Sequence, residues 1–551
     1  MDTAAVPGYS AGTAVHDFLL TVSSVRFPTV LVVGRSNLSV RGKSMSPSRR
    51  KTAYWILAIL GVALLVLGWS APANAQFTLQ KISVDKFTNS DSTHRTEVEP
   101  HIFSWGSTVV AAYHVARRPG SIGWGSADVG FSTSTDGGTT WKFGYLPGLT
   151  LNYKAGTYGA AVDPAVAFDA KHGHWLISTL PLVGLGPGDP FIGDVAVSRS
   201  SDGLHWGSPI NVDKTHLDDK NWTVCDNTSS SPFYGNCYTE WDQAYGSGDV
   251  LMSVSGDGGQ TWGTGKASAD HAFGLGGEPL VQPNGTVVVP FEGTGINAFT
   301  STDGGNTWGR SVLVSSINSH FDAGGIRNPN LPTAAIDGAG NVYVAWSDCR
   351  FRTGCSTNDI VYSTSANGTT WTAPIRIPID ATTSTVDHFL PGIGIDPNTS
   401  GSTAHITVVY YFYPVSNCGN NCQLEVGFTT STDGGTTWTA GQKLAGPMRL
   451  TWLPVSDNGY MVADYIGVSY NNGNPFGVFA VALKPNGSSL NEAMYTTKQP
   501  LLAAEGAARF SSALDKPVPG AKSDHKQAFY YDDEQKRPIP QSRIDAYMKS
   551  H

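Results

Sequence analysis

The segment Ser301-Thr-Asp303-Gly-Gly-Asn-Thr-Trp308 carries the pattern that decides the fold: Ser, Asp two residues later, one or two Gly, and then Trp. The short Asp side chain accepts backbone N–H groups of its own turn. The Gly supplies the positive φ that a tight hairpin requires. The Trp lays a large apolar ring beside the turn. The segment therefore predicts a hairpin turn between two strands.

This pattern recurs along the chain in six copies, which lie between residues 134 and 438. The position of the acid is occupied, in order, by Asp136, Asp202, Asp257, Asp303, Asn367 and Asp433. Successive copies are 46 to 66 residues apart, which is the size of a four-stranded sheet with loops of uneven length. Regular recurrence indicates one supersecondary unit repeated in an array. We interpret the six residues as turn-forming rather than catalytic.

The pattern resembles the Asp-box of sialidases and of the wider family of bacterial-neuraminidase-repeat propellers. The resemblance implies an all-β fold, a single β-propeller of four-stranded blades, over residues 76–499. After the sixth copy, residues 464–470 and 476–483 predict two strands of a further unit that lacks the pattern. Residues 77–84 are similar to a strand that follows a box, so we expect the N- and C-terminal strands to complete one blade and close the ring. This count gives seven blades; six is the alternative if the last unit is partial.

An export signal is predicted before the repeats. Arg49-Arg50-Lys51 precedes an apolar run from Tyr54 to Trp69, and Ala73-Asn-Ala75 provides the small residues that signal peptidase requires. We predict a secretory signal peptide over 45–75 and a secreted, periplasmic or cell-envelope protein. The apolar run is shorter than the ~20 residues of a spanning helix, so membrane attachment is expected only if the signal is not cleaved.

The two ends of the chain are not assigned to the propeller. Residues 1–44 precede Met45, which we take as the true start, so they are interpreted as an extension from a wrongly assigned start codon. Residues 500–551 are polar and charged, without the repeated pattern, and are interpreted as a C-terminal tail.

The charge of the exported part argues against some partners. Residues 1–75 contain seven Lys and Arg and two Asp and Glu, so the total of −8 leaves −13 on the remainder. Nucleic acids and anionic lipids require basic patches, and no nucleic-acid partner is expected. We expect a monomer with a glycan or protein ligand at the propeller face.

The six cysteines fall into three close pairs: Cys225 and Cys237, Cys349 and Cys355, Cys418 and Cys422. Pairing of neighbours is the simplest connectivity, and each disulfide would brace one loop in an oxidising compartment. A metal site is the rival interpretation, but no histidines accompany these cysteines at ligand spacing. We therefore expect no metal and no cofactor.

Ligand sites in propellers lie on loops that enter the first strand of a blade or leave the second. The predicted entrances carry Glu97, Glu99, Asp163, Asp218, Asp219, Glu278, Arg327, Asp387, His388 and Asp464. The predicted exits carry Arg117, Arg118, Asp242, Glu292, Asp348, Arg350 and Arg352. Carboxylates repeated at equivalent entrances also fit a structural role, because they can cap backbone amides where the chain turns.

The family resemblance implies a sialidase site with three arginines that hold the substrate carboxylate, a Tyr nucleophile activated by a Glu, and an acid. Matching by chain order gives Tyr465 as nucleophile with Glu278 or Glu292. The candidate carboxylate-binding arginines are Arg95, Arg117, Arg327 and Arg350. The family's Arg-Ile-Pro motif occurs here only at Arg376-Ile-Pro378, after the fifth box, which is the wrong place.

Two function classes follow. The first is an exported, glycan-directed propeller that hydrolyses glycosides, as an exo-sialidase does, or binds them on its face. The alternative is a non-catalytic propeller that binds a protein or a cell-envelope partner, and a polysaccharide lyase is a lesser possibility. Whether the chain is an enzyme stays open, because one fold hosts both activities.

Overall fold

The computed structural model describes residues 77–520, except 120–124, 185–190, 215–217, 244–246, 457 and 504–505. Contacts divide the chain into Met1–Asn74 and Ala75–His551, and every described residue belongs to the second unit. The predicted extension, the predicted signal peptide and the end of the predicted tail lie outside the described residues. Within the described part, no helix is long and apolar enough to cross a membrane.

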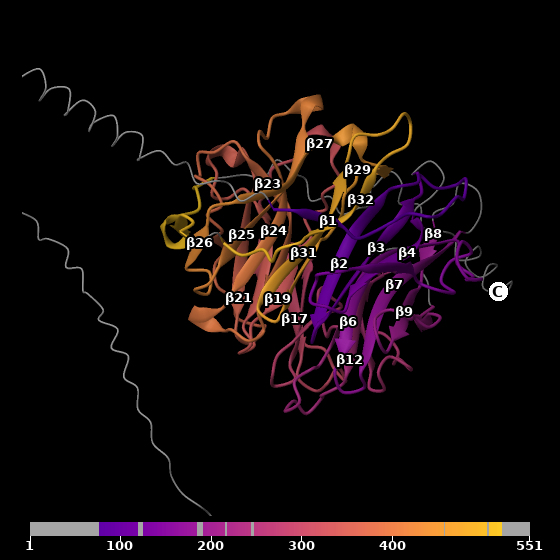
Figure 1. The fold of residues 1–551 in the computed structure, drawn as a ribbon. Helices are drawn as coiled ribbons and strands as arrows, with labels where there is room; N and C mark the ends of the chain where they lie inside the picture. The colour runs from indigo at the N-terminus through magenta and orange to yellow at the C-terminus, as the bar shows by residue number, and fades with distance from the viewer. Residues whose placement is uncertain are drawn as a thin grey trace, which may run out of the picture. The chain divides into compact units, whose positions relative to one another are not determined.

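The described chain is all-β and consists of antiparallel sheets joined by turns and short 3-10 segments, as Figure 1 shows. Its strands form successive four-stranded sets, here called sheets 1 to 7. Sheet 1 contains β2 (Glu97–Trp105), β3 (Thr108–Arg117), β4 (Ser126–Ser134) and β5 (Lys142–Tyr145). Sheet 2 contains β6 (Ala160–Asp169), β7 (His174–Gly184), β9 (Val195–Ser200) and β10 (Ile210–Asp213), with β8 (Phe191–Gly193) paired to β7. One residue pair, Ser126 with Ala161, joins these two sheets.

The next three sheets repeat the same order. Sheet 3 contains β11 (Asp219–Cys225), β12 (Cys237–Asp242), β13 (Val250–Ser255) and β14 (Lys266–Ala267). Sheet 4 contains β15 (Leu280–Val281), β16 (Val287–Glu292), β17 (Ile296–Ser301) and β18 (Val312–Ser315). Sheet 5 contains β19 (Thr333–Ile336), β20 (Val342–Asp348), β21 (Asp359–Ser365) and β22 (Ile375–Arg376).

The last two sheets include the chain ends. Sheet 6 contains β23 (Asp387–Ile395), β24 (Ile406–Tyr413), β25 (Gln423–Ser431) and β27 (Gln442–Arg449). Sheet 7 contains β30 (Gly467–Asn471), β31 (Asn474–Ala482), β32 (Glu492–Thr497) and β1 (Leu79–Lys81). The pairs outside these sheets are β26 (Thr437–Thr439) with β33 (Arg509–Ser511) and β28 (Val455–Ser456) with β29 (Gly459–Tyr460).

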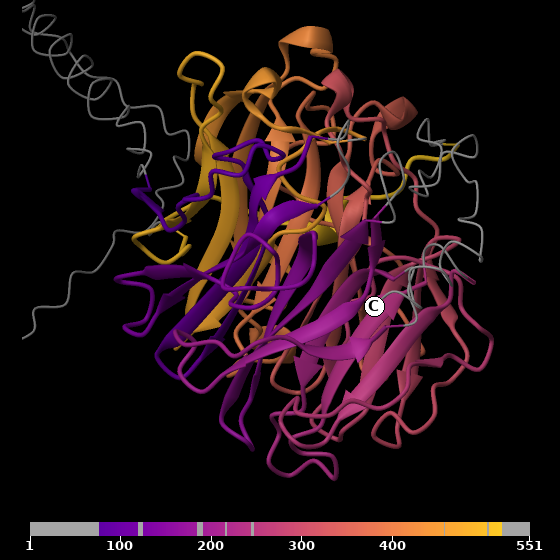
Figure 2. The same cartoon turned by 90° about the vertical axis from the view of Figure 1, so that its right-hand side faces the viewer.

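The first strands of successive sheets lie next to one another. β2 contacts β6, β6 contacts β11, and the series continues through β15, β19, β23 and β30. β30 in turn contacts β2, and β1 pairs with β32, so strands from both ends of the described chain lie side by side (Figure 2). Each first strand therefore contacts the first strands of two other sheets, so residues at the starts of different sheets can meet.

The hydrophobic core lies between neighbouring sheets. One cluster joins Tyr238 and Met252 of sheet 3 to Val289 and Phe299 of sheet 4, and Trp308 packs among them. The middle strand β16 is buried along its whole length, as expected for a strand with packed sheets on both sides. Trp308 belongs to the fourth copy of the repeated pattern, so each such Trp is placed to cover the seam between two sheets.

The repeated turns make the hydrogen bonds that their sequence predicts. In the fourth copy, Asp303 Oδ1 accepts the Thr307 N–H at 2.9 Å and the Ser301 hydroxyl at 2.9 Å. Its Oδ2 accepts the Thr307 hydroxyl at 2.6 Å. The fifth copy is one residue shorter and forms its turn with an amide, since Asn367 Oδ1 accepts the Thr370 N–H at 2.9 Å. One acceptor oxygen is thus sufficient for the turn.

The predicted cysteine pairing is confirmed. The three disulfides join Cys225 to Cys237, Cys349 to Cys355 and Cys418 to Cys422. The first links β11 to β12, whereas the other two each close a short loop after the second strand of a sheet.

Candidate functional site

The starts of three first strands carry a shared local feature. Glu99, Asp163 and Lys220 have positive φ values of 54°, 48° and 44°. Each lies in a register shift of the pairing with the second strand, and Glu99 and Asp163 each precede a proline. Proline is tolerated in a strand at such a bulge, because the hydrogen-bond ladder is interrupted there. Positive φ is strained for these residue types, and strain of this kind concentrates at functional or otherwise over-determined sites.

The bulged residues meet in a buried ion-pair network, which we call the central charged cluster: Glu99, His114, Asp163, Lys220, Arg327 and Asp464. Lys220 Nζ lies 2.7 Å from Asp464 Oδ2, 3.3 Å from Asp163 Oδ1 and 3.5 Å from Glu99 Oε1. Arg327 binds Asp464 with two donors, of which Nε lies 2.6 Å from Oδ1. Asp464 is therefore shared by both cations of the cluster.

Burial and ion pairing set the protonation of this cluster. Burial alone would lower the pKa of Lys220, but Asp163, Asp464 and Glu99 raise it well above its ordinary value. Burial would likewise raise the pKa of Asp464, but Arg327 and Lys220 lower it well below its ordinary value. Lys220, Arg327 and Asp464 are therefore charged at neutral pH.

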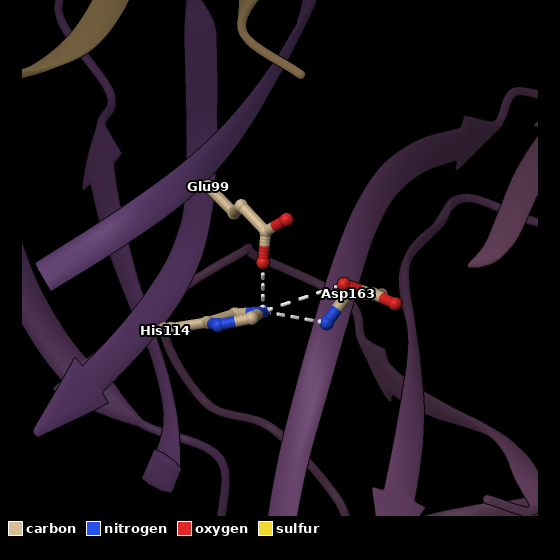
Figure 3. Close-up of side chains that lie close together, drawn as sticks. All are labelled: Glu99, His114 and Asp163. Atoms are coloured by element: carbon tan, nitrogen blue, oxygen red, sulfur yellow. Dashed lines mark hydrogen bonds and ion pairs between the residues drawn. The ribbon is translucent and has the colours of Figure 1, made fainter. Parts of the chain in front are cut away.

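Figure 3 shows His114 between Glu99 and Asp163. The main-chain N–H of Asp163 donates to His114 Nε2 at 2.7 Å, so this nitrogen is an acceptor and the ring is neutral. Burial lowers the pKa of His114 to about 4. Glu99 Oε2 lies 3.1 Å from the same nitrogen, and burial raises the pKa of Glu99 well above its ordinary value. Glu99 therefore binds its proton more strongly than an ordinary glutamate does.

Glu99, His114 and Asp163 have ligand-type atoms close enough together to consider a metal ion. Two observations argue against one. Lys220 Nζ already lies beside the two carboxyl groups, and the lone pair of His114 Nε2 is taken by a main-chain donor. In the second such group, Asp359 and Asp380 bind the guanidinium groups of Arg352 and Arg376 instead. Both groups hold a protein cation where a metal would lie.

The structure brings two of the predicted catalytic residues to one small cavity. Tyr465 and Glu278 line it together with Lys220 and Trp222. The Tyr465 hydroxyl donates to the Pro164 carbonyl at 3.3 Å, and burial raises its pKa well above the ordinary value. The cavity volume is about 10 Å³, which is room for one water molecule and not for a sugar.

Glu278 and Glu292 are both buried carboxyl groups. Glu278 Oε2 accepts the Ala334 N–H at 2.6 Å, and burial raises the pKa of Glu278 to about 8. Glu292 ends β16, and burial raises its pKa well above the ordinary value. Glu278 is the member of the pair that lines the cavity beside Tyr465.

The four candidate arginines bind different partners. Arg95 donates to the Asn491 side chain at 2.6 Å, and Arg350 binds Asp348 through two donors at 2.8 Å and 2.7 Å. Arg327 belongs to the central charged cluster. Arg117 is buried at the end of β3, where its main-chain N–H donates to Thr96 Oγ1 at 2.8 Å. Three of the four guanidinium groups therefore meet protein acceptors in three separate places.

Sequence reasoning missed two members of the cluster. Lys220 lies at the start of β11, where β2 has Glu99 and β6 has Asp163, and His114 lies in the apolar strand β3. The only available signal was the positive charge of Lys220 at a position that is acidic in those two strands.

A second cavity lies beside β1 and β27 and shares no lining residue with the cluster. Its volume is about 540 Å³. The lining consists of Phe77, Thr78, Leu79, Leu444, Ala445, Gly446, Pro447, Met448, Trp452, Val481, Ala482 and Leu483. We call it the Trp452 groove. This lining has no charged side chain, so it offers apolar rings and main-chain groups but no acid, base or cation.

Comparisons with known proteins gave matches among solved structures. No protein-family model matches the chain, and no curated protein matches it. A Dyadobacter fermentans protein of unknown function has a TM-score of 0.42 and 15% identity, over 64% of this chain and 99% of that one. The intramolecular trans-sialidase of Ruminococcus gnavus has a TM-score of 0.38 and 12% identity, over 76% of this chain and 98% of that one.

A third similar structure is the Trypanosoma rangeli sialidase in complex with the inhibitor DANA. Its TM-score is 0.36 at 11% identity, over 76% of this chain and 59% of that one. Similarity of this degree carries no information about the activity or the substrate of this chain.

Proposed function

We propose that the chain is an exported seven-bladed β-propeller that binds a glycan without sialidase chemistry. The succession of seven four-stranded sets, the contacts among their first strands and the pairing of β1 with β32 support the propeller. Three disulfides support an oxidising compartment outside the cytosol. The repeated turns, which resemble those of a glycan-directed family, are the reason to consider glycans first.

The contacts of Asp464 are the main argument against sialidase catalysis. A sialidase needs arginines that are available to the substrate carboxylate and a Tyr activated by a carboxylate. Here Asp464 binds Arg327 and Lys220 together, and the Tyr465 hydroxyl donates to a main-chain carbonyl. The adjoining cavity has room for one water molecule. Arg327, Lys220 and the Tyr465 hydroxyl therefore already have partners within the protein.

The Trp452 groove is the better place for a ligand. Its volume of about 540 Å³ falls in the range of small-molecule sites, and Trp452 and Phe77 are partly buried rings on which a sugar can stack. Main-chain groups of residues 444–448 can hydrogen-bond hydroxyl groups. Because no charged side chain lines the groove, we expect a neutral glycan rather than a sialoside.

The test uses the purified protein, a panel of sialosides with a fluorescent aglycone, and a panel of neutral glycans. We expect no sialoside turnover, and binding of at least one neutral glycan that Trp452→Ala weakens about tenfold or more. Trp105→Ala is the matched control, because Trp105 is 40% exposed and stacks on Phe168 elsewhere. Turnover of any sialoside overturns the proposal, as does glycan binding that Trp452→Ala leaves unchanged.

A second candidate is binding of a protein partner. Three segments lie together, namely 316–332, 414–422 and residues 453–456 with 458–462, since the Tyr413 hydroxyl donates to Ala323 O at 3.1 Å and the Arg327 N–H to Tyr460 O at 2.7 Å. They expose Val415 and Val455, at 54% and 58%. Apolar side chains on loops that a disulfide braces favour a protein contact. If this candidate holds, the double change Val415→Asp and Val455→Asp abolishes partner binding while Trp452→Ala does not.

A further inference from the structure

The described end of the chain, residues 508–518, returns to the sheets and lies against sheets 5 and 6; we call it the C-terminal strap. Its β33 pairs with β26, the strand that contains Trp438 of the sixth copy of the repeated pattern. The paired residues are Arg509 with Thr439, Phe510 with Trp438, and Ser511 with Thr437. The Ala440 N–H also donates to Ala508 O at 3.0 Å. Among the described residues, β33 of the strap is the strand that pairs with β26.

The next contact is with the turn itself. The Ser512 hydroxyl donates to Gly435 O at 2.9 Å, and its N–H donates to Thr436 O at 3.3 Å. Ser512 is buried and begins the 3-10 turn η6 (Ser512–Leu514). These bonds satisfy carbonyl groups of the turn that precedes β26.

Charge pairs lie at both ends of the strap. Arg509 attracts Asp433 of the repeated turn. Asp515 Oδ2 lies 2.9 Å from Arg376 Nη1, and the Arg376 side chain is 1% exposed. Farther along, the Val518 N–H donates to Arg350 O at 2.8 Å. A positive residue thus meets an acid at one end, and an acid meets a buried arginine at the other.

We propose that the β26 edge, the Gly435 and Thr436 carbonyls and Arg376 form a peptide-docking groove, and that its occupant is this chain's own segment 508–518. The segment is held by its own strand pairing, buried hydroxyl and charge pairs, as a peptide added to a sheet edge is held. It therefore remains bound without its covalent connection through residues 503–506.

The binding determinant that fixes the register of the strap is Asp515. Strand pairing of three residues alone tolerates a shift along the edge, whereas a carboxylate that reaches a buried guanidinium does so in one register. Arg376 also contacts Asp359 and Asp380, so loss of Asp515 leaves it partly paired and the protein folded. Asp515→Asn should therefore weaken docking without unfolding the sheets.

The experiment replaces residues 503–506 of the full exported chain with a protease recognition sequence, cleaves the folded protein, and follows the C-terminal fragment by gel filtration and mass spectrometry. We expect the fragment to remain bound at micromolar concentration. Asp515→Asn should speed its release about 10- to 100-fold, the effect of one charge-assisted hydrogen bond. Lys516→Ala, at an exposed neighbouring position, is the matched control and should release the fragment at the unmodified rate.

Excess labelled peptide 507–520 should replace the cleaved fragment and co-elute with the protein. Loss of the fragment from the unmodified protein directly after cleavage overturns the docking groove. Equal release rates for Asp515→Asn and Lys516→Ala overturn the role of the Asp515 contact with Arg376. Circular dichroism of each cleaved variant establishes that the sheets are intact in every comparison.

Discussion

Replacing Lys220 with Met tests whether the central charged cluster holds the molecule together. The ammonium group of Lys220 lies 2.7 Å from Asp464, 3.3 Å from Asp163 and 3.5 Å from Glu99, and its side chain is 6% exposed. Met has a similar length and no charge. Asp464 keeps Arg327 in the variant, whereas Asp163 keeps only the neutral His114.

The expected loss of stability follows because Asp163 loses its cationic partner in the variant, whereas Asp464 keeps Arg327. Removing one partner of a buried pair costs about 3–5 kcal/mol, because the remaining charge stays buried without compensation. Total stabilities of single domains are about 5–15 kcal/mol, so a large part of the free energy of unfolding should disappear. Lys443→Met is the control, since Lys443 pairs with Glu425 at 3.0 Å but is 47% exposed, and its loss should cost less than about 1 kcal/mol.

The pH dependence gives a second check. Burial would raise the pKa of Asp163, but the charge of Lys220 lowers it below its ordinary value. A carboxyl group whose pKa is lower in the folded state stabilises above the unfolded pKa of ~3.9, and this stability is lost as the pH falls through the folded value. The difference between the Met variant and the unmodified protein should therefore be largest at neutral pH and shrink as the pH falls below ~4.

The assay is urea unfolding of the purified protein, followed by tryptophan fluorescence at pH 7 and at pH 3. A loss below about 1 kcal/mol at pH 7 would refute the reasoning, because Lys220 would then contribute no more than an exposed lysine. A large loss that is equal at both pH values would refute the assignment of the effect to ionised Asp163.

Three further predictions concern other parts of the molecule. Glu278→Gln should flatten the dependence of stability on pH. In the unmodified protein the pKa of Glu278 is raised to about 8, so the carboxyl group stabilises fully below the unfolded value of 4.5 and loses that stability as the pH rises toward 8. Urea titrations at pH 5 and pH 8 measure this, and an equal pH slope in the variant contradicts it. Asp303→Ala should lower the free energy of unfolding by about 1–2 kcal/mol without affecting glycan binding, whereas Asp303→Asn should cost less, since its amide oxygen can accept main-chain N–H groups as that of Asn367 does in its shorter turn. Equal losses for the two variants count against the turn role. Replacing Cys349 and Cys355 with Ser should lower the free energy of unfolding by about 2 kcal/mol, because this disulfide closes a loop between residues only 6 apart in sequence. A reductant should then change the stability of this variant less than it changes that of the unmodified protein.

The features that could be predicted from the sequence are local ones. The turn around Asp303 depends on residues within four positions, and each disulfide joins cysteines at most 12 residues apart. The second strands, such as Val287–Glu292, can also be predicted from their apolar composition. Local signals of this kind are enough to predict an all-β repeat fold.

The cluster depends on contacts that no local pattern encodes. Asp464 and Arg327 are 137 residues apart, and Asp464 and Lys220 are 244 residues apart. Sequence order suggested Arg327 as a ligand for substrate, because arginine at a loop is a common anion binder. Its orientation toward Asp464 depends on how sheets 5 and 7 meet, and the positive φ of Lys220 depends on the bulge in β11. Both are properties of the assembled sheets.

The same assembly explains why the repeated turns do not indicate an activity. The turns lie between the third and fourth strands, and they hold each Trp against a neighbouring sheet. The starts of the first strands lie at the centre, where their side chains must neutralise one another because each is withdrawn from water. In this chain Lys220, which lies at one of these positions, and Arg327 are the two cations that pair with the buried acid Asp464. A centre whose charges are already paired stabilises the junction of the sheets, and it leaves ligand binding to the grooves and loops around it.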